Sequence, residues 1–495
     1  MIVYHFRWNN RWFSHSRKGG FSMQSVSLKT KLGIFAAGLL SFIGILVETS
    51  MNVTFPTLMR TMHISLATVQ WLTTAYLLLV TIVMSSTAYA LKRFSSRRLF
   101  FFAAVMSLAG TVAAMLAPNF LLLLMGRMLQ AVATGIATPL MFQLVFTRIP
   151  FKQIGKWTGF ASIIVSLAPA LGPTYGGIIT SLWSWRAIFV GVFPLLIIAT
   201  LLGAYSLHAP ALGTDGAHFD WGGLTLLAFT FTSLVIAFST VGEYGWASKT
   251  FGVGLLISAA LMVSMTAYAR HGSRHLFDYR ILKNGVLRQR LLQYFGLQLI
   301  NIGLSFVLPL FAQNVLHATP MGAGLMLLPG ALIGAAVAPL AGKVYDRHGA
   351  NRLLILSATL ASIAMLLFAG LTHHFNIVMI AALYIVFRIG FNSGFGTAVS
   401  DASLQVATRQ KSDQNAMFSM MQQFAGSFGT SLMSAVIAAK ALHMHTVSAT
   451  ITGSQTDFWL LFGFAIVILI TGLLVAKRNK TRRHSGQRKM NRSDD

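Results

Sequence analysis

The sequence predicts an all-α polytopic membrane protein with about fourteen transmembrane helices. Of its 495 residues, 55% are hydrophobic and only 10% are charged, whereas about a quarter of the residues in a typical soluble domain are charged. The mean hydropathy is +0.67. Apolar runs recur along the whole chain, and many reach the roughly 20 residues that a helix needs to cross about 30 Å of hydrocarbon. These observations exclude an ordinary soluble fold.

The apolar runs place the spans in order along the chain. We expect them at residues 33–53, 69–91, 99–117, 120–141, 156–180, 186–206, 221–241, 250–268, 290–312, 321–343, 352–372, 375–398, 415–438 and 457–476. An even number of spans returns the C-terminus to the side on which the chain begins.

Lys and Arg support this order because they resist translocation and gather in cytoplasmic connections. Both tails are basic, and every second connection is rich in cations: Lys92, Arg93, Arg97, Arg98, Arg148, Lys152, Lys156, Arg270, Arg274, Arg280, Lys283, Arg288, Lys343, Arg347 and Arg352. The intervening connections hold chiefly Arg60, Lys249 and Lys440. We therefore expect a multi-pass protein of a bacterial plasma membrane with both termini in the cytoplasm.

The formal net charge of +27 follows from this topology. It suits an anionic lipid surface, so membrane lipids are expected partners and nucleic acid is not. The chain has no Cys, which excludes disulfides and thiolate metal sites. His373, His374, His443 and His445 fall in predicted outer loops, and no metal site is expected.

The first 22 residues are rich in Arg, Trp and Asn and lack the apolar core of a signal peptide. The codons of Lys18, Gly19 and Gly20 can form a purine-rich run that resembles a bacterial ribosome-binding site. We expect translation to start at Met23, so that residues 1–22 are not translated. Detection of Met1 or Ile2 at the mature N-terminus by mass spectrometry would contradict this expectation.

Internal repetition divides the chain into two sets of helices. Arg127 lies in the fourth span and Arg388 in the twelfth, which is the fourth helix of a second set, and buried arginines are rare in membrane spans. The basic connections at 88–101 and 342–354 also correspond. The predicted parts are a basic N-terminal segment at 1–31, a six-helix bundle at 32–206, an inserted helix pair at 207–289, a second six-helix bundle at 290–476, and a basic tail at 477–495.

From about Leu32 to Val475 this arrangement resembles the major facilitator superfamily, in particular its fourteen-span drug:proton antiporter branch. The first-span run LVETSMNVTFP resembles that branch's motif, although Val47 stands in place of the family's Asp and the acid follows as Glu48. Arg127 and Gln130 match the fourth-span motif. The fifth-span residues Gly172, Pro173, Gly176 and Gly177 resemble the antiporter signature G-P-x-x-G-G.

The resemblance assigns a gating role to the connections that follow the second and tenth spans. In the first connection Lys92 replaces the family's usual Asp, and Arg93 follows it. The second connection keeps the motif, with Gly342, Asp346, Arg347 and Gly349. We therefore expect Asp346 to carry the acid-mediated contact alone.

The function implied by the resemblance is proton-coupled efflux of lipophilic drugs or toxic compounds, cationic ones in particular, by alternating access in a monomer. The chain has no G-x-x-x-x-G-K-[ST] loop to cradle ATP phosphates, so the proton gradient is the expected energy source and no cofactor is expected. Abundant Met and Phe would line an adaptable cavity. Its candidate polar residues are Asn52, Gln70, Gln130, Asn301 and Arg388.

Glu48 is the one acid of eleven that falls deep inside a predicted span. It lies about 22 Å along a span that starts in the cytoplasm, and Arg127 lies about 10 Å along a span that starts outside, so their depths nearly coincide. An Arg neighbour favours the ionised carboxylate and desolvation favours the protonated form, which makes a proton-operated switch. Three alternatives stay open: a structural Glu48, an Arg127 that only clamps helices, and an Arg388 that meets an anionic substrate.

Two further questions stay open at this point. The one-residue displacement of the acid turns it by roughly 100° on the helix, so Glu48 faces either the cavity or a neighbouring helix. A membrane sensor or lipid-handling scaffold of the same fold, without proton-driven transport, is the alternative function, and its activity would be insensitive to a protonophore. A channel or a membrane enzyme is disfavoured because the spans hold no selectivity loop and no cluster of acids or histidines.

Overall fold

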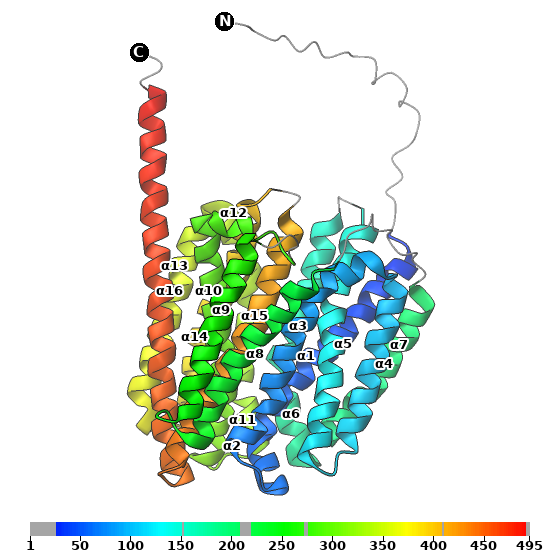
Figure 1. Ribbon diagram of the computed structural model, residues 1–495, viewed down its shortest axis with the longest axis vertical. Coiled ribbons are helices and arrows are strands. Elements are labelled where there is room, and N and C mark those ends of the chain that lie inside the picture. Colours follow the sequence, from blue (N-terminus) through cyan, green and yellow to red (C-terminus); the bar gives the residue numbers. More distant parts are fainter. Residues whose placement is uncertain (1–25, 151–152, 208–218, 272–275, 408–409, 492–495) are drawn as a thin grey trace, which may run out of the picture.

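The computed structural model describes residues 26–150, 153–207, 219–271, 276–407 and 410–491, and in this part the chain forms helices and no strand. The predicted start at Met23, and Lys152, Arg274 and residues 1–22, lie outside the described residues. Figure 1 shows long helices running side by side, with the start of the first helix and the end of the last helix on the same side of the bundle. The all-α fold class is confirmed.

The helices have the following bounds: α1 Leu28–Met62, α2 Leu66–Val69, α3 Trp71–Arg93, α4 Ser96–Met115, α5 Phe120–Arg148, α6 Ile154–Leu182, α7 Ala187–Ser206, α8 Trp221–Tyr244, α9 Lys249–His271, α10 Gly285–Asn314, α11 Pro320–Leu325, α12 Leu328–His348, α13 Ala350–Leu371, α14 Ile377–Leu404, α15 Lys411–Ala441 and α16 Thr446–Asn491. Two short 3₁₀ turns, η3 Tyr279–Lys283 and η4 Thr372–His374, precede α10 and α14.

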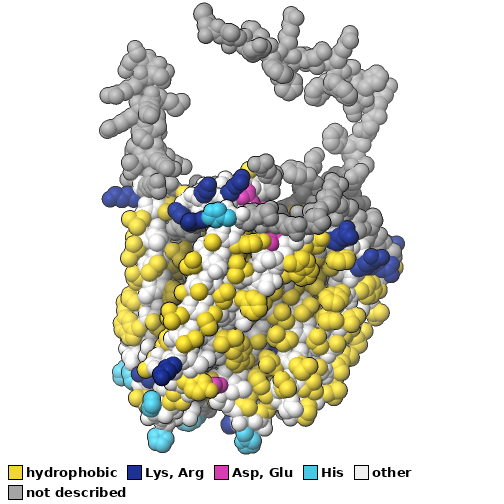
Figure 2. Space-filling model, viewed as in Figure 1, with side chains coloured by type: hydrophobic (Ala, Val, Ile, Leu, Met, Phe, Trp, Pro, Cys, Tyr) yellow, Lys and Arg dark blue, Asp and Glu magenta, His cyan; other side chains and the backbone are white. Residues whose placement is uncertain are grey.

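Thirteen of the fourteen predicted spans lie mainly on one helix of 20 residues or more, and the span predicted at 321–343 covers most of α11 and the first part of the long helix α12. Within the described residues, twelve helical stretches are long and apolar enough to cross a membrane. The helices α6 and α15, which carry the predicted spans 156–180 and 415–438, are not among the twelve, although they have 29 and 31 residues and pack against the others. On the face seen in Figure 2, hydrophobic side chains form a broad band across the middle of the molecule.

Local sequence signals explain where several helices begin and end. The side chains of Ser27, Asn119 and Asn376 accept hydrogen bonds from backbone N–H groups in the first turns of α1, α5 and α14, which satisfies donors that a helix start leaves free. The helix α12 ends at His348 and is capped by Gly349, whose φ is +74° and whose ψ is 174°. Glycine adopts this conformation without the cost that a Cβ would add.

The helices pack as two groups with a pair between them. One group contains α1 and α3 to α7, and the other contains α10 and α12 to α16. Between them, α8 packs against α3 of one group and α15 of the other, while α9 packs mainly against α8. The division of the chain at 206/207 and 289/290 stays a prediction.

We call the end of the bundle at which α3 and α12 end the basic end, because Arg93, Arg97, Arg98 and Arg347 lie there. The other end is called the opposite end. Within the described residues, four hydrogen bonds join the first group to the second group or to α11, the short helix that lies between α10 and α12 in the sequence, and all lie toward the opposite end. Gln313 Nε2 donates to the Val53 carbonyl (2.8 Å), the Met321 backbone N–H to Ser181 Oγ (2.9 Å), Ser427 Oγ to the Thr74 carbonyl (2.9 Å), and Thr174 Oγ1 to the Gly324 carbonyl (3.3 Å).

Candidate functional site

Glu48 lies on the face of α1 that packs against α3 and α5. One turn before it, the carbonyl of Gly44 accepts a hydrogen bond from Tyr76 of α3 at 3.1 Å, and Gly44 also packs directly against Thr134 of α5. One turn after it, Asn52 accepts a hydrogen bond from Thr73 of α3 at 2.7 Å. Glu48 itself is 4% exposed. Because positions four apart share a helix face, the displaced acid faces neighbouring helices within its own group.

Arg127 extends from α5 into the same interior and is fully buried. Its Nη1 donates a hydrogen bond to Gln130 Oε1 at 2.7 Å, and Gln130 Nε2 in turn donates to Thr111 Oγ1 of α4 at 2.9 Å. The guanidinium lies over the ring of Tyr76, 4.1 Å from the ring centre, which is a cation–π contact. These contacts fix the position of the guanidinium between α3, α4 and α5.

Glu48, Tyr76 and Arg127 interact electrostatically with one another. The carboxylate of Glu48 and the guanidinium of Arg127 do not form an ion pair within 4 Å. Among the described residues, Arg290 and Asp401 form the one such pair. Arg127 also keeps Nε and Nη2 without a hydrogen-bond partner among the described residues. A buried guanidinium with two spare donors near a buried carboxylate can pair with that carboxylate after a small movement, or release it on protonation.

The other polar candidates of this group differ in how far their bonds are satisfied. Gln70 donates to Ser239 of α8 at 3.1 Å and accepts a short hydrogen bond from Thr74, so it ties α8 to the first group. Asn52 keeps its Nδ2 buried without a partner in the described structure. Gln130 is fully engaged between Arg127 and Thr111.

The second group contains a buried arginine at the corresponding helix. Arg388 of α14 donates from Nη1 to Asn301 Oδ1 of α10 at 2.7 Å. Both side chains are buried, at 5% and 4% exposure. Of the five cavity candidates, Arg388 and Asn301 therefore lie together in the second group. The other three, Asn52, Gln70 and Gln130, lie in the first group.

The four residues of the fifth-span signature form two close helix contacts. Gly172 packs against Thr49 of α1 and Gly176 against the backbone of Ser50, and Ser50 Oγ donates to the Gly172 carbonyl at 2.8 Å. Gly177 packs against the backbone of Pro320 at the start of α11, and the carbonyl of Pro173 packs against Gly324. One face of the signature, Gly172 and Gly176, thus packs α6 against α1, and the other face, Pro173 and Gly177, packs α6 against α11.

The predicted gating residues lie at the basic end. Arg93 is the last residue of α3 and is exposed, as are Gly342, Asp346, Arg347 and Gly349 at the end of α12. Asp346 forms no ion pair within 4 Å with a described residue. Its gating role stays a prediction.

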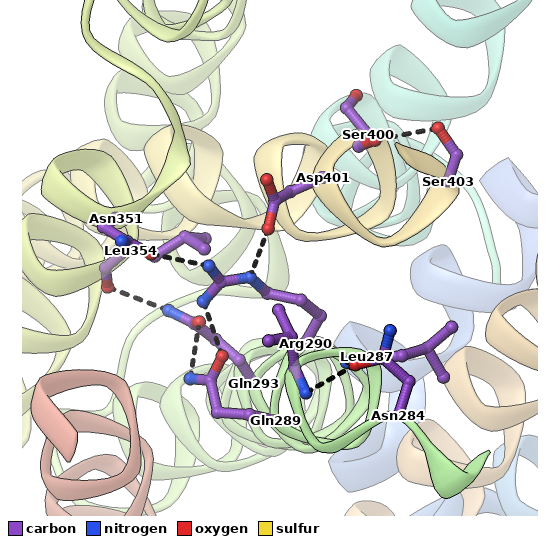
Figure 3. A network of polar contacts seen from close by, with 11 residues as sticks. Asn284, Leu287, Gln289, Arg290, Gln293, Asn351, Leu354, Ser400, Asp401 and Ser403 are labelled. Atoms are coloured by element: carbon purple, nitrogen blue, oxygen red, sulfur yellow. Dashed lines mark hydrogen bonds and ion pairs between the residues drawn. The ribbon is translucent and has the colours of Figure 1, made fainter. Parts of the chain in front are cut away.

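The ion pair at this end, Arg290–Asp401, was not predicted from the sequence. Arg290 near the start of α10 is 2% exposed, and Figure 3 shows its guanidinium at the centre of a polar network. Its Nε donates to Asp401 of α14 at 2.7 Å, its Nη1 to Gln289 at 2.5 Å, and its Nη2 to Asn351 of α13 at 2.7 Å. Asp401 and Arg290 were expected at span ends, and nothing in the sequence marks them as partners.

The expectation that Glu48 alone lies deep in a span is wrong. The predicted last span begins at Asp457, but α16 begins at Thr446, so Asp457 lies about 17 Å along the helix. Its side chain is fully buried, and both carboxyl oxygens lack a hydrogen-bond partner among the described residues. The polar run before residue 457 hid the true start of this helix.

Comparison with known proteins places the chain among transporters. The family model described as Major Facilitator Superfamily matches residues 37–430. An uncharacterised MFS-type transporter of Bacillus subtilis, YcnB, is 31% identical over 90% of this chain and 93% of that protein. The lincomycin resistance protein LmrB of Listeria monocytogenes is 30% identical over 88% and 93%, and a multidrug resistance protein B homologue of Mycobacterium tuberculosis is 28% identical over 77% and 71%.

Solved structures share the fold at low sequence identity. A peptide transporter POT in complex with sulfate has a TM-score of 0.66 and 12% identity over 90% of this chain and 94% of that chain. A bacterial homologue of the human lysosomal transporter Spinster, in an inward-facing and unoccupied conformation, has a TM-score of 0.64 and 13% identity over 92% and 98%. These similarities show the fold alone.

Proposed function

This chain belongs to the Major Facilitator Superfamily, and from that premise we propose that it exports lipophilic drugs or toxic compounds in exchange for protons. It is a multi-pass membrane transporter and not an enzyme. The relatives whose names refer to lincomycin resistance and multidrug resistance support export of foreign compounds. The Met-rich and Phe-rich composition supports a lipophilic substrate, and a cationic one is our expectation.

The proposed orientation places the basic end in the cytoplasm of a bacterial cell, with the protein in the plasma membrane. Arg93, Arg97, Arg98, Arg148 and Arg347 support it, since cytoplasmic connections carry the excess of Lys and Arg. Both chain ends then lie in the cytoplasm. The opposite end faces the outside.

In this orientation the structure corresponds to a state closed toward the outside. The contacts of Gly177 with Pro320 and of Gly324 with Pro173, and the hydrogen bond between Ser181 and Met321, support this assignment. The two six-helix bundles, 32–206 and 290–476, are the proposed moving bodies. Alternating access then consists of breaking these contacts while new ones form at the basic end.

Glu48 and Arg127 are the proposed coupling pair. In the state open to the outside, Glu48 takes up a proton, which removes its attraction to Arg127 and favours release of the exported compound. In the state open to the cytoplasm, the proton leaves and the carboxylate regains its attraction to the guanidinium. Protonation of Glu48 shifts the equilibrium between the two states only because Arg127 attracts the ionised carboxylate more strongly than the protonated one.

The single observation that carries this proposal is the buried Glu48 beside an Arg127 whose Nε and Nη2 have no partner among the described residues. Ionisable groups inside a membrane are costly to keep and are a functional hypothesis by default. In a salt bridge with a purely structural role, the carboxylate would instead accept hydrogen bonds from these donors of Arg127.

The experiment is uptake of cationic, neutral and anionic lipophilic dyes into everted vesicles, with and without a proton gradient. The proposal predicts accumulation of at least the cationic dyes that a protonophore abolishes. Accumulation that is insensitive to a protonophore would contradict proton coupling, and no accumulation of any dye would contradict export of lipophilic compounds.

A further inference from the structure

Arg388 is a cation buried in the second group, and it forms no ion pair within 4 Å with a described residue. It is 5% exposed on α14, and one of its N–H groups is bound by Asn301 of α10. Its guanidinium also lies 5.0 Å from the ring centre of Phe391 and 6.0 Å from that of Tyr384. Aromatic faces attract a cation but do not neutralise its charge.

One donor of this guanidinium has no hydrogen-bond partner among the described residues. It is the buried Nε, whereas Asn301 accepts from Nη1. Two glycines of α12 let that helix pack closely against the Arg388 side chain: a Cβ at Gly334 would lie 3.2 Å from Nε, and one at Gly330 would lie 3.3 Å from Cγ, so a larger side chain at either position would crowd the arginine. The edge formed by Nε and Nη2 is a side-on binding geometry for a carboxylate or a phosphate group, which takes two parallel hydrogen bonds.

The helices packed against α14 offer no nearby acid. These helices are α10, α12, α13 and α15. Their described acids, Asp346 on α12 and Asp413 on α15, and Asp401 on α14 itself, lie near the basic end of their helices. Asp401 is about 20 Å along the helix from Arg388, and Asp346 is about 18 Å along α12 from Gly334.

The buried Asp457 of α16 does not fill this role either. It lies at a similar distance from the opposite end as Arg388, but it belongs to α16, which is not among the helices packed against α14, and it forms no ion pair within 4 Å with a described residue. Arg127 in the first group differs, since Glu48 acts on it electrostatically. The two related positions therefore hold a compensated and an uncompensated arginine.

We propose that Arg388 and Asn301 bind the carboxylate of a transported lipophilic compound. The proposal rests on the transport function proposed above and adds a substrate class to the cationic one expected there: lipophiles that carry an acid group, alone or together with an amine. The bound carboxylate supplies the missing counter-charge, Nε and Nη2 donate to its oxygens, and Phe391 and Tyr384 contact the apolar part of the compound.

The test compares naphthoate with naphthamide, its neutral isostere, by thermal-shift titration of the purified full-length protein at constant ionic strength. Hydrogen bonds to charged groups predict that the wild type binds naphthoate roughly tenfold to a hundredfold more tightly than naphthamide. Arg388→Gln should remove this preference. Arg186→Gln, which removes one positive charge at the opposite end, should leave it unchanged.

Arg388→Lys keeps the positive charge without the planar guanidinium and should retain only part of the preference for naphthoate over naphthamide. If Arg388→Gln does not fold, the Lys variant supplies the test. Equal binding of the two probes by the wild type, or an undiminished preference in both Arg388 variants, would overturn the proposal. Binding is measured without a proton gradient. Failure of proton coupling in vesicles therefore leaves this result intact, and the two proposals fail independently.

Discussion

The contact between α6 and α11 offers the sharpest test of the proposed closed end. A Cβ added at Gly177 would overlap the carbonyl oxygen of Pro320 and would lie 3.1 Å from its carbonyl carbon and 3.2 Å from the Cα of Met321. These neighbours are backbone atoms that no rotamer change can move away. Gly177→Ala must therefore push the two groups apart at the opposite end.

The expected magnitude follows from the cost of overpacking. An extra methyl group in a tightly packed contact costs about 1–3 kcal/mol. In the alternating-access account this cost applies only to the state closed toward the outside, because the contact is absent when that end is open. A difference of 1–3 kcal/mol shifts a two-state equilibrium about 5- to 150-fold.

The chain contains no Cys, so a cross-link between two introduced cysteines can be measured without interference from native thiols. The Met321 backbone N–H contacts Ser181 Oγ at 2.9 Å, and cysteines at these two positions should form a cross-link in the closed state. Gly177→Ala should lower the cross-linking yield, whereas Gly370→Ala, whose Cβ would meet open space, should not. An unchanged yield in folded Gly177→Ala protein would refute the reasoning.

Three further predictions concern stability, measured as the free energy of unfolding in mixed micelles. Asp401→Asn should lower it by about 2–3 kcal/mol, because the buried Arg290 loses its counter-charge; a loss below 0.5 kcal/mol, about the noise of such a titration, would contradict the network's role. Gly349→Ala should cost about 1–2 kcal/mol, since φ is +74° there, and Gly342→Ala is its control because open space surrounds Gly342. Asp457→Asn should leave stability unchanged or higher, since neither carboxyl oxygen has a described partner; a large loss would reveal an undetected partner.

The sequence was sufficient for the fold because the signals of a membrane helix are local. A run of about 20 apolar residues is evident without knowledge of its neighbours, and thirteen of the fourteen predicted spans lie mainly on one long helix. The predicted helix ends were less accurate. At α16, the mostly polar segment from Thr446 to Thr456 forms the first turns of the helix, before the apolar run begins. For this reason Asp457 was wrongly predicted to lie at the end of a span.

The site was only partly accessible from the sequence. Depth along two helices predicted that Glu48 and Arg127 lie at one level, and both are buried in the first group, where Tyr76 contacts the Arg127 guanidinium and the Gly44 carbonyl one turn before Glu48. Which face Glu48 presents depends on the rotation of α1 in the bundle, which is set by contacts such as Gly44 with Thr134. Likewise, the Arg290–Asp401 pair joins residues 111 positions apart, and no local pattern predicts such a partnership.

The central claim is that protonation of Glu48 couples transport to the proton gradient. The most direct measurement is accumulation of ethidium, a lipophilic cation, in everted vesicles that carry wild-type protein, Glu48→Gln, or Glu243→Gln as a matched control at an exposed acid. The account predicts protonophore-sensitive accumulation for the wild type and the control, and only equilibration without concentration for Glu48→Gln. Uphill, protonophore-sensitive accumulation by Glu48→Gln would contradict it.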